Sequence, residues 1–155
     1  MNSITVKVLE KRCEYKENPL GIDTPKPRFS WKIKALKRAA GQVVAYNIQV
    51  WDETGKCIWD TGKCESDNTV NVQYEGQPLE SRKEYRWTLK VWDKQRGTRY
   101  ETDAEKFETA ILEDSEWKAE WIRGGNLLRK EFSADKKIKK SRVYISGLDL
   151  SGALY

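Results

Sequence analysis

The chain has 155 residues, which is enough for one complete domain and part of another. Charged residues make up 34% of it and its net charge is +5, and it contains no apolar run of about 18 residues such as a membrane-spanning helix requires. Histidine is absent, which excludes histidine-activated nucleophiles and histidine-ligated metals.

The three cysteines are predicted to be reduced thiols. Cys13, Cys57 and Cys64 are odd in number and form no CxxC pair, so they indicate neither a disulfide framework nor a zinc site. The first residues, MNSITVKVLEKR, lack the apolar centre of a secretory signal, and we therefore expect a cytoplasmic protein. No pattern in the sequence indicates a cofactor or a membrane partner.

The first element is predicted to be a strand, followed by a proline-rich loop. Ile4, Val6 and Val8 alternate with polar residues, as in a half-buried strand, and the strand continues irregularly to Tyr15. The next stretch, ENPLGIDTPKP, holds three prolines and a glycine, and proline fixes φ and lacks the N–H donor. We therefore expect an ordered loop that crosses between two strands.

Residues 28–35 are predicted to form the second strand, because apolar side chains alternate there with serine and lysine. Trp31 is the candidate for the central core tryptophan. A hairpin-type connection is expected at residues 38–41, which read RAAG.

Residues 45–52 are predicted to form the third strand, with Ile48 facing inward and Trp51 facing outward. The following residues, ETGK, indicate a turn in which Gly55 adopts a positive φ.

The stretch 83–93 is the strand around which the rest of the chain is organised. Its sequence, KEYRWTLKVWD, alternates strictly and places Trp87 inward and Trp92 outward. Tyr85 enters this strand just after a turn, which favours a tyrosine corner, in which the hydroxyl bonds to upstream backbone. The alternative is an ordinary core tyrosine.

These strands predict an all-β fold. Further short strands are expected at residues 57–60, 70–74 and 105–111, which makes seven strands within residues 1–111 and leaves no amphipathic helix. The pattern predicts a seven-stranded fibronectin type III or immunoglobulin-like β-sandwich. The lack of a disulfide and the position of Trp31 favour the fibronectin type III variant.

A cross-strand pair follows from this topology. The third and sixth strands are expected to be antiparallel neighbours, and if Ile48 faces Leu89, then Trp51 faces Arg86. This register predicts a cation–π contact between the Arg86 guanidinium and the Trp51 indole.

The stretch 112–126 is predicted to be a linker. It begins with an acidic cluster, Glu113, Asp114 and Glu116, which we interpret as solvated and not as a catalytic carboxylate pair. Trp117 and Trp121 have the spacing of one helical face, and they are also suited to pin a linker against the sandwich; we favour the second interpretation.

Residues 127–155 are predicted to be the opening strands of an incomplete second β domain. Strands are expected at residues 127–132 and 141–145, and two strands alone cannot form a core. The exposed edges of the segment 127–155 could pair with the same segment of a second chain and form a homodimer. The basic stretch 136–142, KKIKKSR, is a nucleic-acid patch or a solvated turn, and we favour the turn.

The chain resembles the N-terminal region of bacterial α-L-rhamnosidases. The most specific stretch is NPLGIDTPKPRFSW at residues 18–31, followed by WDTGK at residues 59–63. The agreement continues with YRW at 85–87, WKAEWI at 117–122 and LRKEF at 128–132, and only residues 148–155 depart from the pattern. The motifs are specific as an ordered set that covers nearly the whole chain.

The resemblance implies a fibronectin-like module and the start of a carbohydrate-binding, jelly-roll domain. In that family the catalytic (α/α)₆ barrel of an inverting glycoside hydrolase follows much later, so no catalytic residue can be assigned here. The expected function is a non-catalytic accessory fragment that braces the domains of the parent enzyme, which are its expected partners.

Two other functions are open. Outward Trp51 and Trp92 are candidates for stacking on the sugar rings of a rhamnose-containing glycan, although both could equally be docking contacts for the following domains, which we favour. A nucleic-acid role through residues 136–142 is the weakest of the alternatives, and no nucleic-acid partner is expected.

Overall fold

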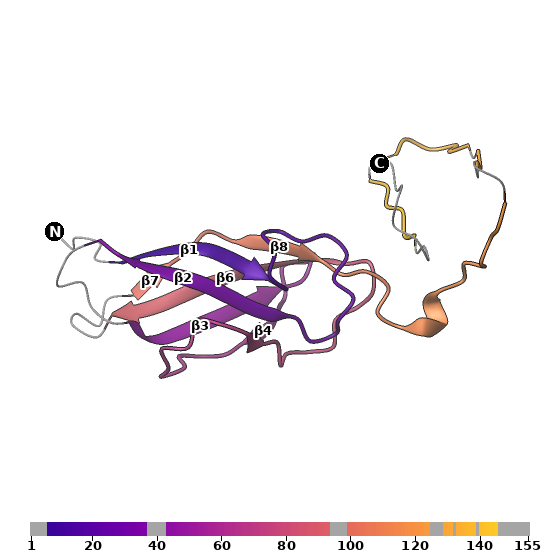
Figure 1. Ribbon diagram of the computed structural model, residues 1–155. Helices are drawn as coiled ribbons and strands as arrows, with labels where there is room; N and C mark the ends of the chain where they lie inside the picture. The colour runs from indigo at the N-terminus through magenta and orange to yellow at the C-terminus, as the bar shows by residue number, and fades with distance from the viewer. Residues whose placement is uncertain are drawn as a thin grey trace. The chain divides into compact units, whose positions relative to one another are not determined.

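The computed structural model describes residues 6–36, 43–93, 99–124, 129–131, 133–138 and 140–145. Within these ranges the chain forms eight strands and one 3₁₀ turn (Figure 1). They are β1 (Val6–Cys13), β2 (Arg28–Ala35), β3 (Val43–Trp51), β4 (Cys57–Asp60), β5 (Val72–Gln73), β6 (Glu84–Asp93), β7 (Arg99–Glu101), β8 (Glu105–Glu108) and η1 (Asp114–Glu116). No helix in the described ranges is long and apolar enough to cross a membrane.

The strands form two antiparallel sheets, and the predicted all-β, immunoglobulin-like sandwich is confirmed. One sheet has the order β1-β2-β5, and the other has the order β4-β3-β6-β7, with β8 also paired to β6. Strand β6 is central because β3 runs along one side of it while β7 and β8 share the other. The alternation of its sequence follows from this position, since one face lies on the core and the other faces outward.

Aromatic side chains fill the space between the sheets. Phe29 of β2 lies with its ring centroid 4.6 Å from that of Trp87 and 6.0 Å from that of Phe107. Trp31 and Trp87 expose only 2% and 1% of their surface, which confirms both as core residues. Aromatic rings at such separations add to the stability that their burial provides.

The predicted register of β3 and β6 is confirmed. Ile48 pairs with Leu89, and Trp51 pairs with Arg86. Because side chains alternate along each strand, this register places Trp51 and Arg86 on the outward face, opposite the core.

The tyrosine corner is also confirmed. The Tyr85 hydroxyl accepts a hydrogen bond of 2.9 Å from the backbone N–H of Glu80, five residues upstream. Thr109 ties the same corner to the last strand, because its hydroxyl donates to the Glu80 carbonyl at 2.6 Å and accepts from the Lys83 N–H at 3.0 Å.

The proline-rich segment is an ordered crossing loop, as predicted. The Ile22 N–H donates to the Glu108 carbonyl at 2.8 Å, and the Ala110 N–H donates to the Ile22 carbonyl at 2.7 Å. The Asn18 side chain accepts from the Lys106 N–H at 2.7 Å. The loop therefore satisfies backbone groups along β8 that an open sheet edge would leave to solvent.

Three details of the prediction are wrong. The residues 38–41 lie outside the described ranges, but β2 and β3 on either side of them belong to different sheets, so the connection is not a hairpin. The predicted strand 70–74 is reduced to β5, because Asn71 adopts a φ of +55° and breaks the alternation. Strand β7 was not predicted, since three residues are too few to show a period.

The chain divides into two compact units, Met1–Trp117 and Lys118–Tyr155. In the second unit the strands predicted at 127–132 and 141–145 do not form over their described residues, 129–131 and 141–145. Val143 and Ile145 expose 82% and 79% of their surface, so neither is covered by a second layer whose packing would stabilise a strand. The boundary drawn at residue 111 and the expected homodimer through 127–155 stay predictions.

Candidate functional site

The two outward tryptophans lie on paired strands but at opposite ends of the pairing. Trp51 ends β3 and pairs with Arg86, whereas Trp92 near the end of β6 pairs with Ala45. Both side chains are half-buried, in contrast to the core pair Trp31 and Trp87. They therefore cannot form one continuous stacking surface, and each has to be considered alone.

The ring of Trp92 already has a cation beside it. The Lys63 ammonium lies 5.6 Å from the Trp92 ring centroid, within the range of a cation–π contact. Lys63 comes from the segment after β4, which Asn47 fixes to β3 by donating to the Gly62 carbonyl at 2.9 Å. Part of the Trp92 ring is thus already in contact with Lys63, and the sugar-binding and docking roles considered for Trp92 stay predictions.

The cation–π contact predicted at Trp51 is wrong, although the register that suggested it is right. Among the described residues the cations placed over aromatic rings are Lys63 on Trp92 and Arg28 on Tyr15. Arg86 is exposed and lies opposite Trp51 in the strand register, but its guanidinium is not placed over the Trp51 ring. Strand pairing fixes the backbone, and an exposed arginine keeps its rotamer freedom.

Trp51 and Arg86 instead line an open hollow of about 380 Å³, together with the turn residues 52–55 and Ala104. We call this the Trp51 hollow. The turn is held by Asp52, whose Oδ1 accepts from the Thr54 N–H at 2.9 Å, the Thr54 hydroxyl at 2.6 Å and the Lys56 N–H at 3.0 Å. The hydrogen bond from the Thr54 side chain, with those from the backbone, holds the pKa of Asp52 below its ordinary value. Asp52 is therefore a carboxylate at neutral pH.

The predicted turn at residues 53–56 is confirmed, and a glycine is needed in it. Gly55 has a φ of +86°, in the left-handed region that side chains with a Cβ rarely adopt. Its N–H donates to the Asp52 carbonyl at 3.1 Å, and the Asp52 N–H donates to the Lys56 carbonyl at 3.0 Å. The turn that borders the Trp51 hollow is thus fixed by its own hydrogen bonds.

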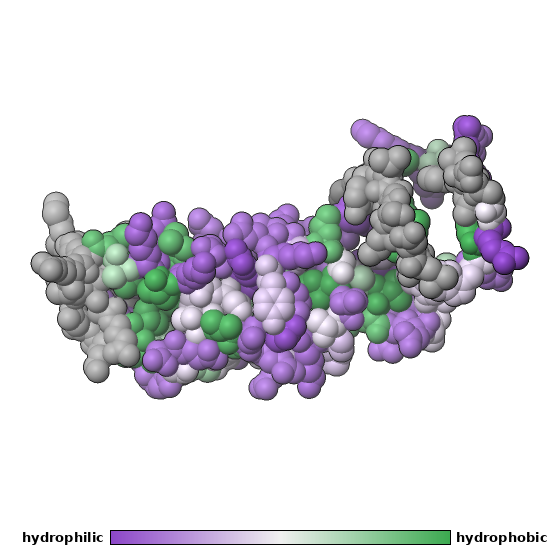
Figure 2. Space-filling view, in the orientation of Figure 1, coloured by the Kyte–Doolittle hydropathy of each residue, from purple (hydrophilic) through white to green (hydrophobic). Residues whose placement is uncertain are grey.

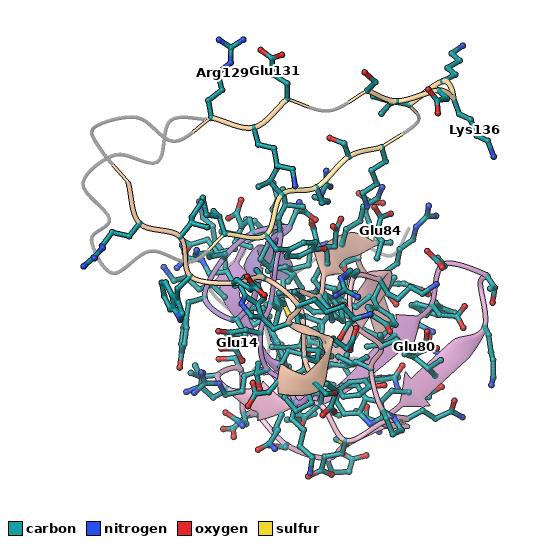
Figure 3. The ribbon with its side chains drawn as sticks, turned by 90° about the vertical axis from the view of Figure 1, so that its right-hand side faces the viewer. Glu14, Glu80, Glu84, Arg129, Glu131 and Lys136 are labelled. Atoms are coloured by element: carbon teal, nitrogen blue, oxygen red, sulfur yellow. The ribbon has the colours of Figure 1, made fainter. Side chains whose placement is uncertain are left out.

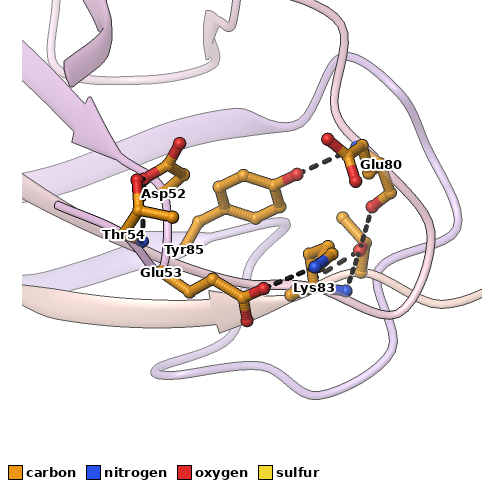
Figure 4. Close-up of polar contacts among 7 residues, drawn as sticks. Asp52, Glu53, Thr54, Glu80, Lys83 and Tyr85 are labelled. Atoms are coloured by element: carbon orange, nitrogen blue, oxygen red, sulfur yellow. Dashed lines mark hydrogen bonds and ion pairs between the residues drawn. The ribbon is translucent and has the colours of Figure 1, made fainter. Parts of the chain in front are cut away.

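An ion pair joins this turn to the tyrosine corner. The Lys83 ammonium contacts the Glu53 carboxylate, which raises the pKa of Lys83 (Figure 4). A smaller hollow of about 80 Å³ lies here, lined by Asp52, Glu53, Thr54, Glu80, Lys83 and Tyr85. The pairing neutralises Glu53, one of the two acidic residues that line the Trp51 hollow.

Where the chain leaves the sandwich, Glu116 fastens it to the corner. Its carboxylate accepts from the Ser81 hydroxyl at 2.5 Å and from the Arg82 guanidinium at 2.7 Å. The Ser81 oxygen also accepts from the Leu112 N–H at 2.9 Å. We call Ser81, Arg82, Leu112 and Glu116 the exit clasp.

The exit clasp corrects two expectations about the linker. Glu116 is not a solvated residue, although Glu113 and Asp114 are exposed as predicted. Trp117 and Trp121 are not on a helix. Within the first unit the Glu116 carboxylate anchors the segment, while Trp117 exposes 39% of its surface; the anchoring role expected of Trp121 stays a prediction. Sequence reasoning missed the exit clasp because Ser81 and Arg82 lie more than thirty residues away from Glu116.

Several of the described acidic side chains outside these clusters form ion pairs on the surface. Glu14 pairs with Arg28 and Glu84 pairs with Lys106 at 3.2 Å, at separate places on the sandwich (Figure 3). In the second unit Arg129 contacts Glu131. Within the described ranges, no three Cys, Asp or Glu side chains lie together as a metal site would require.

The surface of the sandwich is mainly hydrophilic. On the face shown in Figure 2, polar and charged side chains cover most of the area and apolar ones form small patches. The described residues of the basic stretch 136–142 are exposed, with a bend at Lys136. Nothing in these residues organises the lysines into a groove that could follow a phosphate backbone.

Comparison with known proteins shows which family this sandwich resembles. Residues 8–113 match the model of the family described as Rha78A-like, N-terminal immunoglobulin domain. An alpha-L-rhamnosidase from Streptomyces avermitilis is 34% identical over 121 residues, which cover 76% of this chain and 12% of that protein. An alpha-L-rhamnosidase from Formosa agariphila is 33% identical and matches 83% of this chain and 14% of its own length.

Solved structures give the same result. The alpha-L-rhamnosidase of Dictyoglumus thermophilum has a TM-score of 0.68 at 34% identity, over 81% of this chain and 14% of that one. The Streptomyces avermitilis enzyme complexed with L-rhamnose has a TM-score of 0.67 at 34% identity, over 76% of this chain. The chain thus spans about one eighth of the length of these relatives.

Proposed function

The chain belongs to the family of Rha78A-like N-terminal immunoglobulin domains, and we propose that it is the non-catalytic accessory domain of an α-L-rhamnosidase, with the role of bracing the domains that follow it. The relatives that support this are named as alpha-L-rhamnosidases, and the chain matches 12–14% of their length. The arrangement of Glu14, Glu84 and Glu116 agrees with a non-catalytic role, because each of these carboxylates is held by an ion pair within the domain.

The observation that carries the bracing role is the exit clasp. Without it, the last contacts between the chain and the sandwich would be those of β8 and the residues just after it. With it, the compact unit extends to Trp117, and Glu116 is held by two side chains of the tyrosine corner. A domain that follows a fixed exit loses less freedom on docking, which favours a single arrangement of the two domains.

The absence of catalysis is tested on the chain alone. Purified chain, free of host glycosidases, is incubated with p-nitrophenyl α-L-rhamnoside beside a full-length rhamnosidase as a positive control. We expect no release of p-nitrophenol above the buffer blank. Release that scales with the concentration of the chain would contradict the assignment.

The bracing role is tested in a full-length relative. The matching segment of the Streptomyces avermitilis enzyme is deleted in one variant and replaced by residues 1–117 of this chain in another. We expect deletion to lower the temperature of half-inactivation and replacement to restore most of it. A Glu116→Gln replacement should restore less than a Glu113→Gln control, because only Glu116 belongs to the exit clasp. Equal inactivation temperatures for the deletion and the intact enzyme would reject bracing.

A further inference from the structure

The Trp51 hollow combines an aromatic ring with polar groups that the protein itself leaves unused. Within the described part of the chain, the Arg86 guanidinium takes no hydrogen-bond or ion-pair partner. The three hydrogen bonds to Asp52 all reach Oδ1, so that Oδ2 is left without a described donor. A donor and an acceptor with spare capacity thus line the same hollow as a half-buried indole.

From this arrangement we propose that the Trp51 hollow binds a single neutral sugar residue. The indole of Trp51 would stack on the apolar face of the ring, the Arg86 guanidinium would donate to hydroxyl or ring oxygens, and Asp52 would accept from a hydroxyl. The volume of about 380 Å³ lies near the lower limit of roughly 300–1,000 Å³ for small-molecule pockets. It therefore suits one sugar ring and not an oligosaccharide.

The charge of the hollow favours a neutral ligand. Arg86 contributes one positive charge and Asp52 one negative charge, whereas the negative charge of Glu53 is paired with Lys83. The charges of the lining residues and of Lys83 therefore balance, so the lining itself offers no net positive charge to an anionic sugar such as a uronate. Neutral hydroxyl groups can both accept and donate, which matches an arginine beside a carboxylate.

Trp51 and the neighbouring turn are held in place before any ligand binds, whereas the exposed Arg86 side chain is free to turn toward the hollow. Backbone pairing holds Trp51 between Arg86 of β6 and Cys57 of β4, and the Asp52 hydrogen bonds hold the turn. Arg86 is then the side chain that has to be ordered when a ligand binds, and the ring and the turn lose little conformational freedom. Trp92 is the control for Trp51: it is also an outward, half-buried tryptophan, but the Lys63 ammonium already lies near its ring.

The experiment titrates the ¹⁵N-labelled chain with methyl glycosides of L-rhamnose, D-glucose and D-galactose, and with D-glucuronate, while the indole N–H signals and the backbone N–H signals of residues 52–55 are followed by NMR; the backbone signals report on Trp51→Ala. We expect saturable shifts of the Trp51 signal with at least one neutral glycoside and no tighter binding of glucuronate. Trp51→Ala and Arg86→Gln should each weaken that binding at least tenfold, and Trp92→Ala should leave it unchanged. Circular dichroism confirms that each variant is folded.

If Trp51→Ala perturbs the folding of β3, a second variant that leaves Trp51 in place still tests the proposal. Ala104→Leu fills the hollow without removing a described contact, and it should abolish binding while the fold persists. No saturable shift of Trp51 with any glycoside, or equal losses in Trp51→Ala and Trp92→Ala, would overturn the proposal. Because binding is measured on the chain alone, its failure leaves the bracing role intact, and failure of bracing leaves the sugar site intact.

Discussion

Truncating Trp31 to alanine should destabilise the sandwich far more than truncating Trp92. Trp31 is 2% exposed and its ring lies 5.3 Å from that of Tyr46, whereas Trp92 is half-buried on the outward face. A buried aromatic side chain covers about 150–250 Å². At about 25 cal/mol per Å² this corresponds to an upper estimate of roughly 4–6 kcal/mol.

One feature of the structure lowers the value for Trp31, and the value for Trp92 follows from its contacts. The Trp31 indole N–H is buried without a hydrogen-bond partner among the described residues, and such a donor costs about 1–3 kcal/mol in the native protein. We therefore expect Trp31→Ala to cost about 3 kcal/mol, the lower end of the usual range for large aromatic truncations. Trp92→Ala loses the contact with Lys63 and part of its burial, which amounts to about 1 kcal/mol.

Guanidinium denaturation followed by far-UV circular dichroism measures both losses, since a fluorescence signal would change with the number of tryptophans. The comparison holds when the m values agree, because m reports the surface exposed on unfolding. Trp31→Phe is the control, since it removes the unpaired N–H and keeps most of the ring; it should cost less than half of Trp31→Ala. Equal losses for the Trp31 and Trp92 truncations would refute the assignment of core and surface.

Four further outcomes are expected. The hydrogen bond from Arg28 lowers the pKa of Glu14, so the stability that Glu14 contributes is present above about pH 4.5 and is lost as the pH falls through the folded-state pKa. The difference in unfolding free energy between the native chain and Glu14→Gln should therefore shrink as the pH is lowered below about 4.5. Iodoacetamide should label exposed Cys57 in the folded chain but leave Cys13 unmodified until unfolding, because burial raises the pKa of the Cys13 thiol, and mass spectrometry of the digested protein locates the label. Tyr85→Phe removes the acceptor of the Glu80 N–H and should cost about 1 kcal/mol in the same denaturation assay, and a loss near zero would mean that water replaces the hydroxyl. The dimer predicted through 127–155 is tested by light scattering of the full chain and of residues 1–117. If each of the two has the molar mass of its own monomer, the predicted dimer is rejected.

The parts of the fold that the sequence predicted are those in which a single strand is long enough to show its period. Strand β6 has ten residues and lies in the middle of its sheet, so its alternation could be derived. The pairing of Ile48 with Leu89 was assumed, and the structure has it. The tyrosine corner could be predicted because its two partners, Glu80 and Tyr85, are five residues apart. Both features could therefore be predicted from residues that are close together in the sequence.

The errors arose where the structure depends on partners that are distant in the sequence. The sequence of residues 38–41 suggested a hairpin, but whether β2 pairs with β3 is decided by the packing of two sheets. The exit clasp joins Glu116 to residues about thirty-five positions earlier, and no spacing rule connects them. The contact expected between Arg86 and Trp51 failed for another reason, because register determines which residues are opposite and not which rotamer an exposed side chain adopts.

Both proposals depend on the same corner of the sandwich. Ser81 and Arg82 bind Glu116 and so hold the exit, whereas the next residue, Lys83, binds Glu53 in the turn that borders the Trp51 hollow. Consecutive residues can reach two different segments because Arg82 has a φ of +61°, which turns the chain sharply at this point. Thr109 and Tyr85 fix the corner itself through their hydrogen bonds to Glu80. The tyrosine corner before β6 therefore serves as the support for the exit clasp on one side and for the Trp51 hollow on the other.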